Sequence, residues 1–378
     1  MTNHRHVKSK TVAIELIILL LITAISALAA ERDGHEFLCV VDPVRGASDT
    51  RIILIDPEAL RVIQTIRSGY DPQIAVSPDG RRLYLSDRRG TQELFTVIEF
   101  GTWNVLLSVE SPQRIYHKVY GRDALAVSPD GRHVYIHKMR ILPGQFDIPG
   151  GSVPRTDEWW DIFDTNSGVF LPRPPHVENC GIVRLFPQAG TLTMICPNRG
   201  EASPADVESG TVNQPFRDPK GERLRLPSLA GSAAAANGSL IYLVSRKGEL
   251  FALNLRDRSI ASAARLELPE KTIVANGLVA LSPAGDRLYV GVGQAALTDR
   301  RYGQGILVFD TGSWKQTGKI EPARSVFSMA VAQDGRRLYT VDPATRTLTV
   351  YDVKTGEQVG LMKNLGDSPA LLISASYR

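Results

Sequence analysis

Two histidines, His133 and His137, stand four residues apart in a stretch rich in β-branched and aromatic residues. Side chains four apart on a β-strand share one face, so this pair could give a metal ion two of its ligands. A zinc site requires three or four ligands, and no further partner is evident in the sequence. The spacing therefore favours exposed or hydrogen-bonded histidines over a metal centre.

A glycine-rich segment, Gly291-Val292-Gly293-Gln294-Ala295-Ala296, imitates a dinucleotide-binding fingerprint after a strand. A phosphate site of that kind needs a helix whose N-terminal N–H groups face the ligand, and no helix follows here. The chain also lacks the C-x-x-C-H, G-x-S-x-G and H-E-x-x-H motifs of covalent haem attachment, serine hydrolases and metalloproteases. We therefore expect no catalytic residue, cofactor site or metal site in this chain.

Two of the three cysteines, Cys180 and Cys196, flank a predicted turn at Pro187–Gly190. Two strands folded back at that turn would place the cysteines opposite each other. Cross-strand neighbours lie about 4.5 Å apart at Cα, which is the short end of disulfide reach. In an exported chain this favours a Cys180–Cys196 disulfide, and the alternative is two buried thiols that face each other. The third cysteine, Cys39, lies in an apolar run and is expected to be a buried free thiol.

The first 30 residues have the pattern of a secretory signal peptide. Basic residues gather in His4–Lys10, an unbroken apolar run covers Leu16–Ile22, and Ala27–Ala29 has small residues at cleavage spacing. The alternative is a retained membrane anchor, but Glu15 shortens the apolar run below the span of about 20 residues that a bilayer requires. We expect cleavage near Ala29–Ala30, export, and a mature protein that has no membrane segment.

Composition and charge limit the classes of protein to which the chain can belong. The 378 residues are 43% hydrophobic and 22% charged, as is usual for a globular chain, and the formal net charge is +4. The basic residues are scattered among turns and form no cluster. A nucleic-acid partner is therefore not expected, because phosphate binding requires concentrated positive charge.

A repeat of about fifty residues organises the chain and defines the elements that position any site. The phrase AVSPDGRRLY at residues 75–84 returns at residues 126–135, 280–289 and 330–339, with weaker copies at 185–192 and 235–242. Each phrase is typical of a strand, a tight turn and a second strand, because Pro, Asp and Gly suit the turn geometry. A second hairpin follows in most units and opens with an acid: Asp56, Asp164, Asp310 or Asp352. These aspartates are interpreted as turn formers and not as acid/base groups.

Four strands per unit at this period predict blades of a β-propeller. The expected second strands are Phe37–Val41, Arg82–Ser86, His133–His137, Thr191–Ile195, Leu240–Val244, Arg287–Gly291 and Arg337–Val341. Only the first of these seven lacks a preceding inner strand, and Ala370–Ser374 at the other end of the chain has the matching pattern. The sequence therefore predicts an all-β, seven-bladed propeller in residues 31–378 that the C-terminal strand closes.

The two faces of such a disc are not equivalent. The regular turns all fall on one face, and the long segments that do not follow the repeated pattern fall on the other. Those irregular segments are Ser111–Gly121, Met139–Asp157, Pro172–Glu178, Asn213–Leu229 and Gly293–Gly303. Because irregular loops carry function more often than repeated turns, we expect the second face to be the working surface.

Three stretches of the chain resemble the heavy subunit of quinoprotein amine dehydrogenases, the methylamine and aromatic amine dehydrogenases. They are Val41–Pro43 with Ile55–Ile63; Asn179–Cys180 with Leu185–Pro187 and Met194–Cys196; and Thr347–Asp352 with Thr355–Glu357 and Asn364–Gly366. The resemblance covers nearly the whole mature chain. It implies a periplasmic propeller of the YVTN and quinoprotein amine dehydrogenase type.

In that family the heavy subunit holds no cofactor. The resemblance implies a small light subunit that bears tryptophan tryptophylquinone, oxidises a primary amine to aldehyde and ammonia, and passes electrons to a small copper protein. It implies an assembly of two heavy and two light chains. Arg45 and Gly46 stand in the first-blade loop, which lines the amine channel in the family. Trp159 and Trp160, beside Met139–Asp157, are predicted to lie on the face that docks the small subunit. The alternative is that the pair straddles the start of a strand, with one ring packed in the blade and the other partly exposed.

A second class of function stays open from the sequence. The chain could be a stand-alone exported propeller that binds a protein or a ligand and has no redox role. The neighbouring gene would discriminate the two, since only the first class requires a small cysteine-rich partner.

Overall fold

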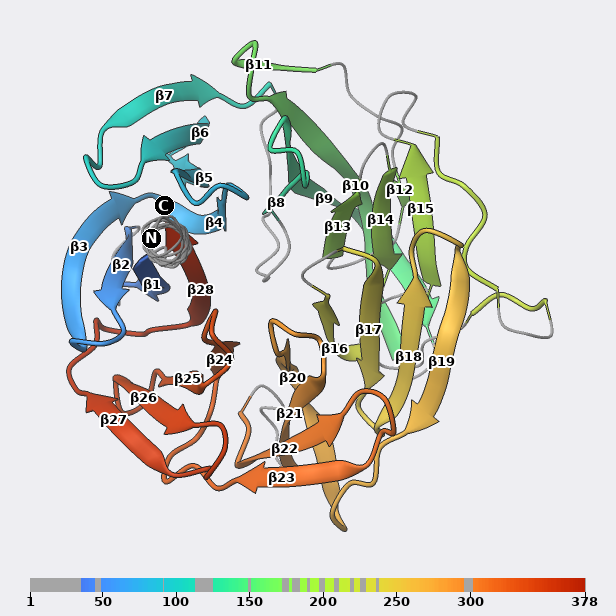
Figure 1. Ribbon diagram of the computed structural model, residues 1–378. Coiled ribbons are helices and arrows are strands. Elements are labelled where there is room, and N and C mark those ends of the chain that lie inside the picture. The colour runs from blue at the N-terminus through green and yellow to red at the C-terminus, as the bar shows by residue number, and fades with distance from the viewer. Residues whose placement is uncertain are drawn as a thin grey trace, which may run out of the picture.

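The computed structural model describes residues 35–44, 49–90, 92–112, 125–148, 151–171, 177–178, 184–188, 191–196, 201–206, 211–217, 221–224, 229–235, 238–295 and 302–377. These residues form seven antiparallel sheets arranged in a ring, which confirms the predicted seven-bladed propeller (Figure 1). Among them, no helix is long and apolar enough to cross a membrane.

The strands of each blade run from the centre of the ring outward. Blade one contains β28 (Leu371–Tyr377), β1 (His35–Pro43), β2 (Thr50–Asp56) and β3 (Arg61–Ser68). Blade two contains β4 (Tyr70–Val76), β5 (Arg82–Arg89), β6 (Gln92–Glu99) and β7 (Val105–Glu110). Blade three contains β8 (Leu125–Val127), β9 (His133–Ile148), β10 (Gly151–Asp164) and β11 (Val169–Phe170), and β12 (Val177–Glu178) also pairs with β10.

The remaining blades follow the same order. Blade four contains β13 (Arg184–Gln188), β14 (Thr191–Cys196) and β15 (Glu201–Asp206). Blade five contains β16 (Leu229–Ala234), β17 (Leu240–Ser245), β18 (Glu249–Asn254) and β19 (Ser259–Arg265). Blade six contains β20 (Thr272–Leu281), β21 (Arg287–Gln294), β22 (Gly305–Asp310) and β23 (Gln316–Ile320). Blade seven contains β24 (Ser328–Val331), β25 (Arg337–Asp342), β26 (Thr347–Asp352) and β27 (Gln358–Met362).

The repeated Ser-Pro-Asp-Gly phrase forms the first turn of a blade through its own side chains. In blade three, Ser128 Oγ donates to Asp130 Oδ1 at 2.5 Å and accepts from the His133 N–H at 2.9 Å. Gly131 has φ of +71°, which any other residue adopts with strain. The hydrogen bonds from the Ser128 hydroxyl and the Arg132 N–H lower the pKa of Asp130. This aspartate is a turn former, as the sequence predicts.

The acid of the second hairpin has the same role. Asp164 Oδ1 accepts from the N–H groups of Asn166 and Ser167 at 3.0 and 2.7 Å. Asp352 Oδ1 accepts equivalent bonds from residues 354 and 355 at 2.9 and 2.8 Å. The hydrogen bond from the Ser167 N–H contributes most to the lowered pKa of Asp164. Both carboxylates thus accept hydrogen bonds from N–H groups of their own turns.

The core lies between the blades, where neighbouring sheets pack face to face. The tyrosine that ends each strong copy of the repeated phrase is fully buried there: Tyr84, Tyr135, Tyr289 and Tyr339. In the seam between blades six and seven, Tyr289 packs with Leu338 and Tyr351 in one apolar cluster. Because both faces of a blade contact a neighbour, its strands are apolar on both sides.

The C-terminal strand closes the ring, as predicted. In β28, Leu372 pairs with Val40 and Ser374 with Leu38, so the inner strand of blade one comes from the other end of the chain. Leu372 is fully buried. Pairing of His35 with Tyr377 also brings the two described ends of the chain together (Figure 1).

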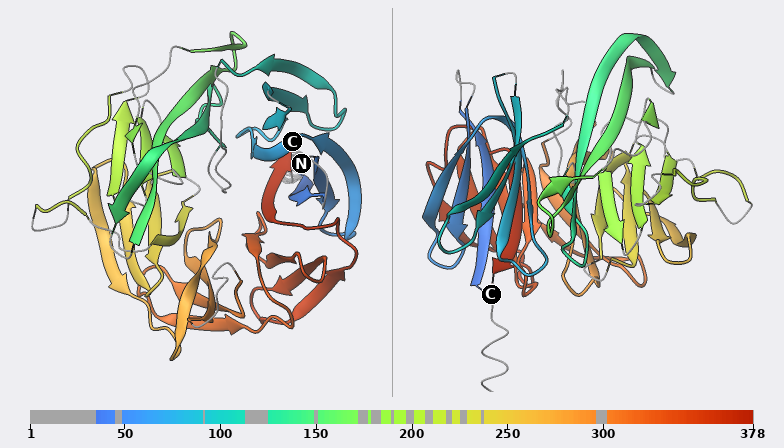
Figure 2. Two further views of the ribbon diagram at one scale, coloured as in Figure 1. Left: turned by 180° about the vertical axis from the view of Figure 1, so that it is seen from behind. Right: turned by 90° about the horizontal axis from the view of Figure 1, so that it is seen from above.

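The β9–β10 hairpin extends far beyond the disc. Figure 2 shows it rising from one face, on the side opposite to the C-terminus. The segment Met139–Asp157 was expected to be irregular, and that expectation is wrong: its described residues continue the pairing of β9 with β10, with one shift of register between Pro154 and Thr156. We call residues 141–155 the arm.

Candidate functional site

The two tryptophans beside the arm lie inside the propeller. Trp159 and Trp160 are each 2% exposed. Trp160 packs against Leu192 and Met194 of blade four. Trp159 belongs to the opposite face of the sheet, where Lys138 is its cross-strand neighbour. The expectation of one partly exposed ring is therefore wrong, because neighbouring blades cover both faces of β10. Neither indole offers surface to a partner of this chain.

Polar groups are buried between blades two and three at the base of the arm. Lys138 of β9 is fully buried and its Nζ contacts Glu93 Oε1 of β6 directly. Asp161 Oδ2 of β10 lies 3.9 Å from the same Nζ. The hydroxyls of Ser86 and Ser111 donate to Glu93 and Asp161 at 2.8 and 3.0 Å. A fully buried lysine requires such partners, since an unpaired buried charge is very costly.

A second buried pair lies on the other side of the same sheet. His137 Nε2 is 3.3 Å from Glu158 Oε2, and both side chains are 1% exposed. The Thr156 hydroxyl donates to the other carboxylate oxygen of Glu158. His133 is nearer the surface, 3.7 Å from Asp164. The two histidines thus pair with carboxylates, and within the described residues no group of three or more potential metal ligands occurs.

The arm continues outward from these buried groups and is exposed. Arg140 Nη2 and Asp157 Oδ2 form an ion pair at 2.6 Å where the arm leaves the blade. Beyond it, Ile141 is 41% exposed, and the described side chains of residues 143–145 are also exposed. In its described residues the arm is thus a two-stranded ribbon, held at its base and largely exposed beyond it. Such ribbons are marginally stable in water without further packing.

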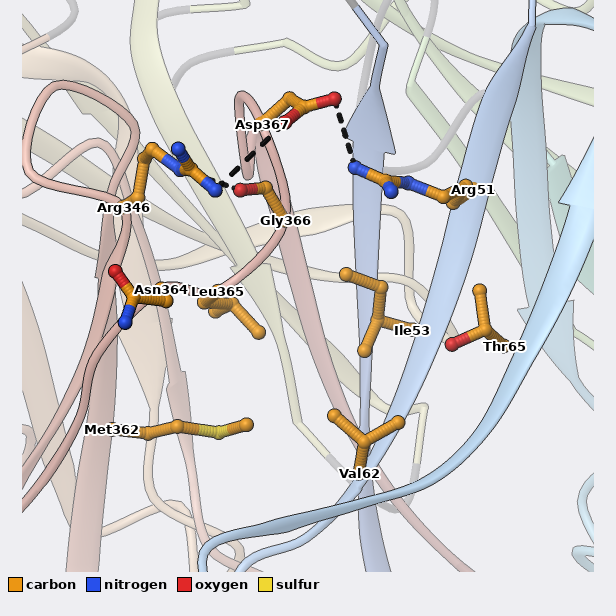
Figure 3. Close-up of a pocket in the computed structure, with 10 residues that line it drawn as sticks. All are labelled: Arg51, Ile53, Val62, Thr65, Arg346, Met362, Asn364, Leu365, Gly366 and Asp367. Carbon is orange, nitrogen blue, oxygen red and sulfur yellow. Dashed lines mark hydrogen bonds and ion pairs between the residues drawn. The ribbon is translucent and has the colours of Figure 1, made fainter.

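The seam between blades seven and one holds a pocket of about 190 Å³. Figure 3 shows Arg51 and Arg346 reaching toward Asp367 from opposite sides, above the apolar side chains of residues 53, 62, 362 and 365. Arg51 lies 3.0 Å from Asp367 Oδ2, and Arg346 Nε donates to the Gly366 carbonyl at 2.6 Å. These groups tie the last blade connection to blade one.

The carboxylate of Asp42 pairs with Arg51 of this pocket and is completely buried. Its Oδ2 accepts two bonds from Arg51, at 3.0 and 2.5 Å. Its Oδ1 accepts the backbone N–H groups of Asp367 and Ser368 at 2.8 and 2.6 Å. Through these bonds Asp42 holds the connection that leads into β28. Both of its carboxylate oxygens accept hydrogen bonds from within the chain.

A cavity of about 540 Å³ lies on the axis of the propeller. Residues of all seven inner strands line it: β4, β8, β13, β16, β20, β24 and β28. Its lining side chains, all among the described residues, are apolar, small or neutral, and none is charged. The described lining of the axial cavity therefore contains no acid, base or nucleophilic thiol that could take part in a reaction.

The glycines of the apparent nucleotide fingerprint have a packing role. A Cβ at Gly291 would lie 2.5 Å from Leu278 Cβ, and one at Gly293 would lie 2.6 Å from the Tyr302 carbonyl oxygen. Both residues belong to β21, in the interior of blade six. The close approach of neighbouring backbone and side chains therefore accounts for these glycines.

Several predicted positions lie outside the described residues: residues 1–30, Arg45, Gly46 and Cys180. Cys196 ends β14 and is 3% exposed. The Cys180–Cys196 disulfide thus stays a prediction. Cys39 is a free, fully buried thiol, as expected, and desolvation raises its pKa far above the usual range.

Comparison with known proteins agrees with the resemblance that the sequence predicts. The family model for the methylamine dehydrogenase heavy chain matches residues 255–376. The methylamine dehydrogenase heavy chain of Methylorubrum extorquens is 22% identical over 358 residues, which cover 89% of this chain and 82% of that protein. The chain is thus similar to methylamine dehydrogenase heavy chains over almost nine tenths of its length. The heavy chain of Paracoccus versutus is 21% identical over 88% of this chain and 78% of its own length.

Solved structures support the propeller fold of this chain. A protein of unknown function from Desulfotomaculum acetoxidans superposes with a TM-score of 0.62 at 12% identity, over 90% of this chain and 99% of that one. Dihydro-heme d1 dehydrogenase NirN superposes with a TM-score of 0.52 at 17% identity, over 87% of this chain and 63% of that one. At such identities these likenesses show the fold alone.

The matched family segment, residues 255–376, contains much of the closing seam. It includes all of blades six and seven and most of β28, together with Arg346 and Asp367 of the seam pocket. Sequence reasoning missed the buried polar groups of blade three. One signal was available: Lys138 occupies the repeat position at which blades one, two and seven have Asp42, Asp87 and Asp342.

Proposed function

We propose that this chain is the heavy subunit of a periplasmic quinoprotein amine dehydrogenase. Its partner is a small light subunit that bears tryptophan tryptophylquinone, oxidises a primary amine to aldehyde and ammonia, and passes electrons to a small copper protein. The chain is exported by its N-terminal segment and assembles as two heavy and two light chains. One observation carries the proposal: similarity to two methylamine dehydrogenase heavy chains extends over almost nine tenths of the chain.

The structure is compatible with a scaffolding role for this chain. The repeated aspartates are bound into turns, the two histidines pair with carboxylates, and the axial cavity has no charged lining. In the proposed assembly the reaction belongs to the partner, and this chain supplies a disc against which the small subunit can be held.

The face that carries the arm is the proposed docking face. The arm stands on the face of the disc opposite the C-terminus (Figure 2). Its exposed ribbon can gain stability by packing against a partner. Arg45 and Gly46 stand in the sequence between β1 and β2, the strands of blade one that correspond to β9 and β10 of blade three.

The test is isolation of the protein from its native cells without a tag. We expect a small cysteine-rich chain to copurify, with quinone absorbance and amine-dependent reduction of an artificial acceptor. Isolation of the intact heavy chain alone, from cells grown on a primary amine, would contradict the proposal. That result would favour a stand-alone exported propeller.

The predicted disulfide offers a separate check on export. Peptide mapping of the unreduced native protein should recover Cys180 and Cys196 in one linked peptide. The loop between them contains 15 residues, for which chain entropy gives about 3 kcal/mol of stabilisation. Recovery of both cysteines as free thiols would count against export and against the family's cysteine hairpin.

A further inference from the structure

The seam between blades two and three contains an amine and two carboxyl groups in a dry, apolar setting. Lys138, Glu93 and Asp161 come from β9, β6 and β10, and their side chains are 0%, 3% and 3% exposed. Phe95 and Phe163 pack in the adjoining apolar cluster, with ring centroids 4.6 Å apart. Within the described part of the chain, an amine thus faces two carboxyl groups, and all three side chains are almost fully buried.

The environment disfavours a permanent ion pair. Removing an ammonium and a carboxylate from water costs several kcal/mol per ion, and their attraction repays this only with excellent geometry. Among the described residues, Lys138 contacts Glu93 and lies 3.9 Å from Asp161. A neutral linkage between Lys138 and Glu93 would remove the charges of the two contacting groups from this buried seam.

We propose that Lys138 and Glu93 condense to an intramolecular amide that joins blade three to blade two. The unprotonated Nζ attacks Cδ of the neutral Glu93 carboxyl group, a C–N bond forms, and a C–O bond breaks. Asp161 takes a proton from the nitrogen and returns it to the departing hydroxyl, which leaves as water. No electrons are exchanged, and no other reactant is required.

Proximity supplies the driving force that free amines and acids lack in water. Well-oriented intramolecular partners have effective molarities of about 10⁵–10⁸ M. Nζ already contacts a Glu93 carboxyl oxygen, and the Ser86 hydroxyl donates to that oxygen at 2.8 Å. The Ser111 hydroxyl holds Asp161 at 3.0 Å. Exclusion of bulk water also suppresses the reverse hydrolysis.

The position of the pair gives the linkage a structural role. The inner strand of blade three, β8, has only three residues, yet its hairpin β9–β10 carries the long arm. At the equivalent repeat position, Asp42 and Asp87 accept backbone N–H groups of the connections into blades one and two. In blade three, Lys138 would replace these hydrogen bonds with a covalent tie at the base of the arm.

The test is peptide mapping of the full-length purified protein after denaturation and digestion with trypsin. We expect a branched peptide in which Gly90–Arg114 is joined to His133–Arg140. Its mass should equal that of the two linear peptides less one water molecule, and trypsin should not cleave after Lys138. A linear peptide that ends at Lys138, recovered in full yield from the wild-type protein, would overturn the proposal.

Two isosteric variants separate the chemistry from an ion pair. Glu93→Gln should form the same branched peptide, because an amide can release ammonia in place of water. Asp161→Asn should leave the peptides linear while the circular dichroism spectrum remains that of a folded propeller. Full cross-linking in Asp161→Asn would overturn the proton transfer assigned to Asp161. The mapping does not depend on the proposed function, because it requires neither a light subunit nor an amine.

Discussion

Replacement of Asp42 tests how the ring is held closed. This carboxylate is fully buried, and its two oxygens serve different partners. Oδ1 accepts the backbone N–H groups of Asp367 and Ser368, whereas Oδ2 accepts both bonds from Arg51. Asp42→Ala removes all of these bonds. Asp42→Asn keeps an oxygen for the two N–H groups and loses only the contacts to Arg51.

The two variants should lose different amounts of stability, because the groups that contact the two oxygens differ in their exposure to water. Hydrogen bonds to a charged group contribute about 1.5–3 kcal/mol each, and residues 367 and 368 are only partly buried, which puts the loss in Asp42→Ala at about 3 kcal/mol. The side chain of Arg51 is 33% exposed and can regain water. We therefore expect a loss of only about 1 kcal/mol in Asp42→Asn.

Equilibrium urea unfolding measures both losses, and the unfolding rate provides a second readout if refolding is incomplete. Hydrogen exchange should rise first in residues 363–370 and in β28, where the connection is released. Equal losses in the two variants would refute the distinct roles of the two oxygens. Full stability of Asp42→Ala would refute the role of Asp42 in closure.

Three further changes test other parts of the fold. Trp160→Ala should lower the free energy of unfolding by about 3–5 kcal/mol in urea, because the ring is buried; a loss below 1 kcal/mol would contradict its place in the core. Deletion of Pro369–Arg378 should lower the melting temperature and cause aggregation on light scattering, because β1 loses its inner neighbour; unchanged melting and solubility would refute closure by β28. The lowered pKa of Asp130 stabilises the fold above the unfolded value of about 3.9, and this contribution is lost as pH falls through the folded pKa. Asp130→Asn should therefore weaken the acid dependence of stability below that pH, and an unchanged pH profile would contradict the turn contacts.

Much of the fold could be predicted because the repeat encodes its strands and turns locally. Six of the seven predicted second strands begin at the residues where the structure begins them, from Arg82 to Arg337. The turn phrase succeeds because Ser128, Asp130 and Gly131 form the turn by contacts within six residues. Closure by β28 was predictable because the count of inner strands left one place empty.

The arm and the tryptophans were mispredicted for physical reasons. Gly144 and Pro154 are typical of loops, but a register shift at Pro154 lets the two strands pair beyond the blade. Alternation along a strand places Trp159 and Trp160 on opposite faces, and one face of a strand is often exposed. In a propeller both faces of a blade are covered, so both rings are buried.

The buried polar groups could not be predicted from local patterns. Glu93 and Lys138 are 45 residues apart and meet only when blades two and three pack together. The sequence shows a lysine where other blades have aspartate, but it does not show which carboxylate faces that lysine. Such a contact depends on the register between neighbouring blades.

Amine-dependent reduction of an artificial electron acceptor distinguishes a scaffolding subunit from a catalytic one. We expect no activity for the isolated, folded heavy chain, and activity for the native assembly that contains the small quinone-bearing subunit. Removal of that subunit should abolish the activity, and adding it back should restore it. Amine oxidation by the isolated chain would contradict the scaffolding role assigned to this propeller.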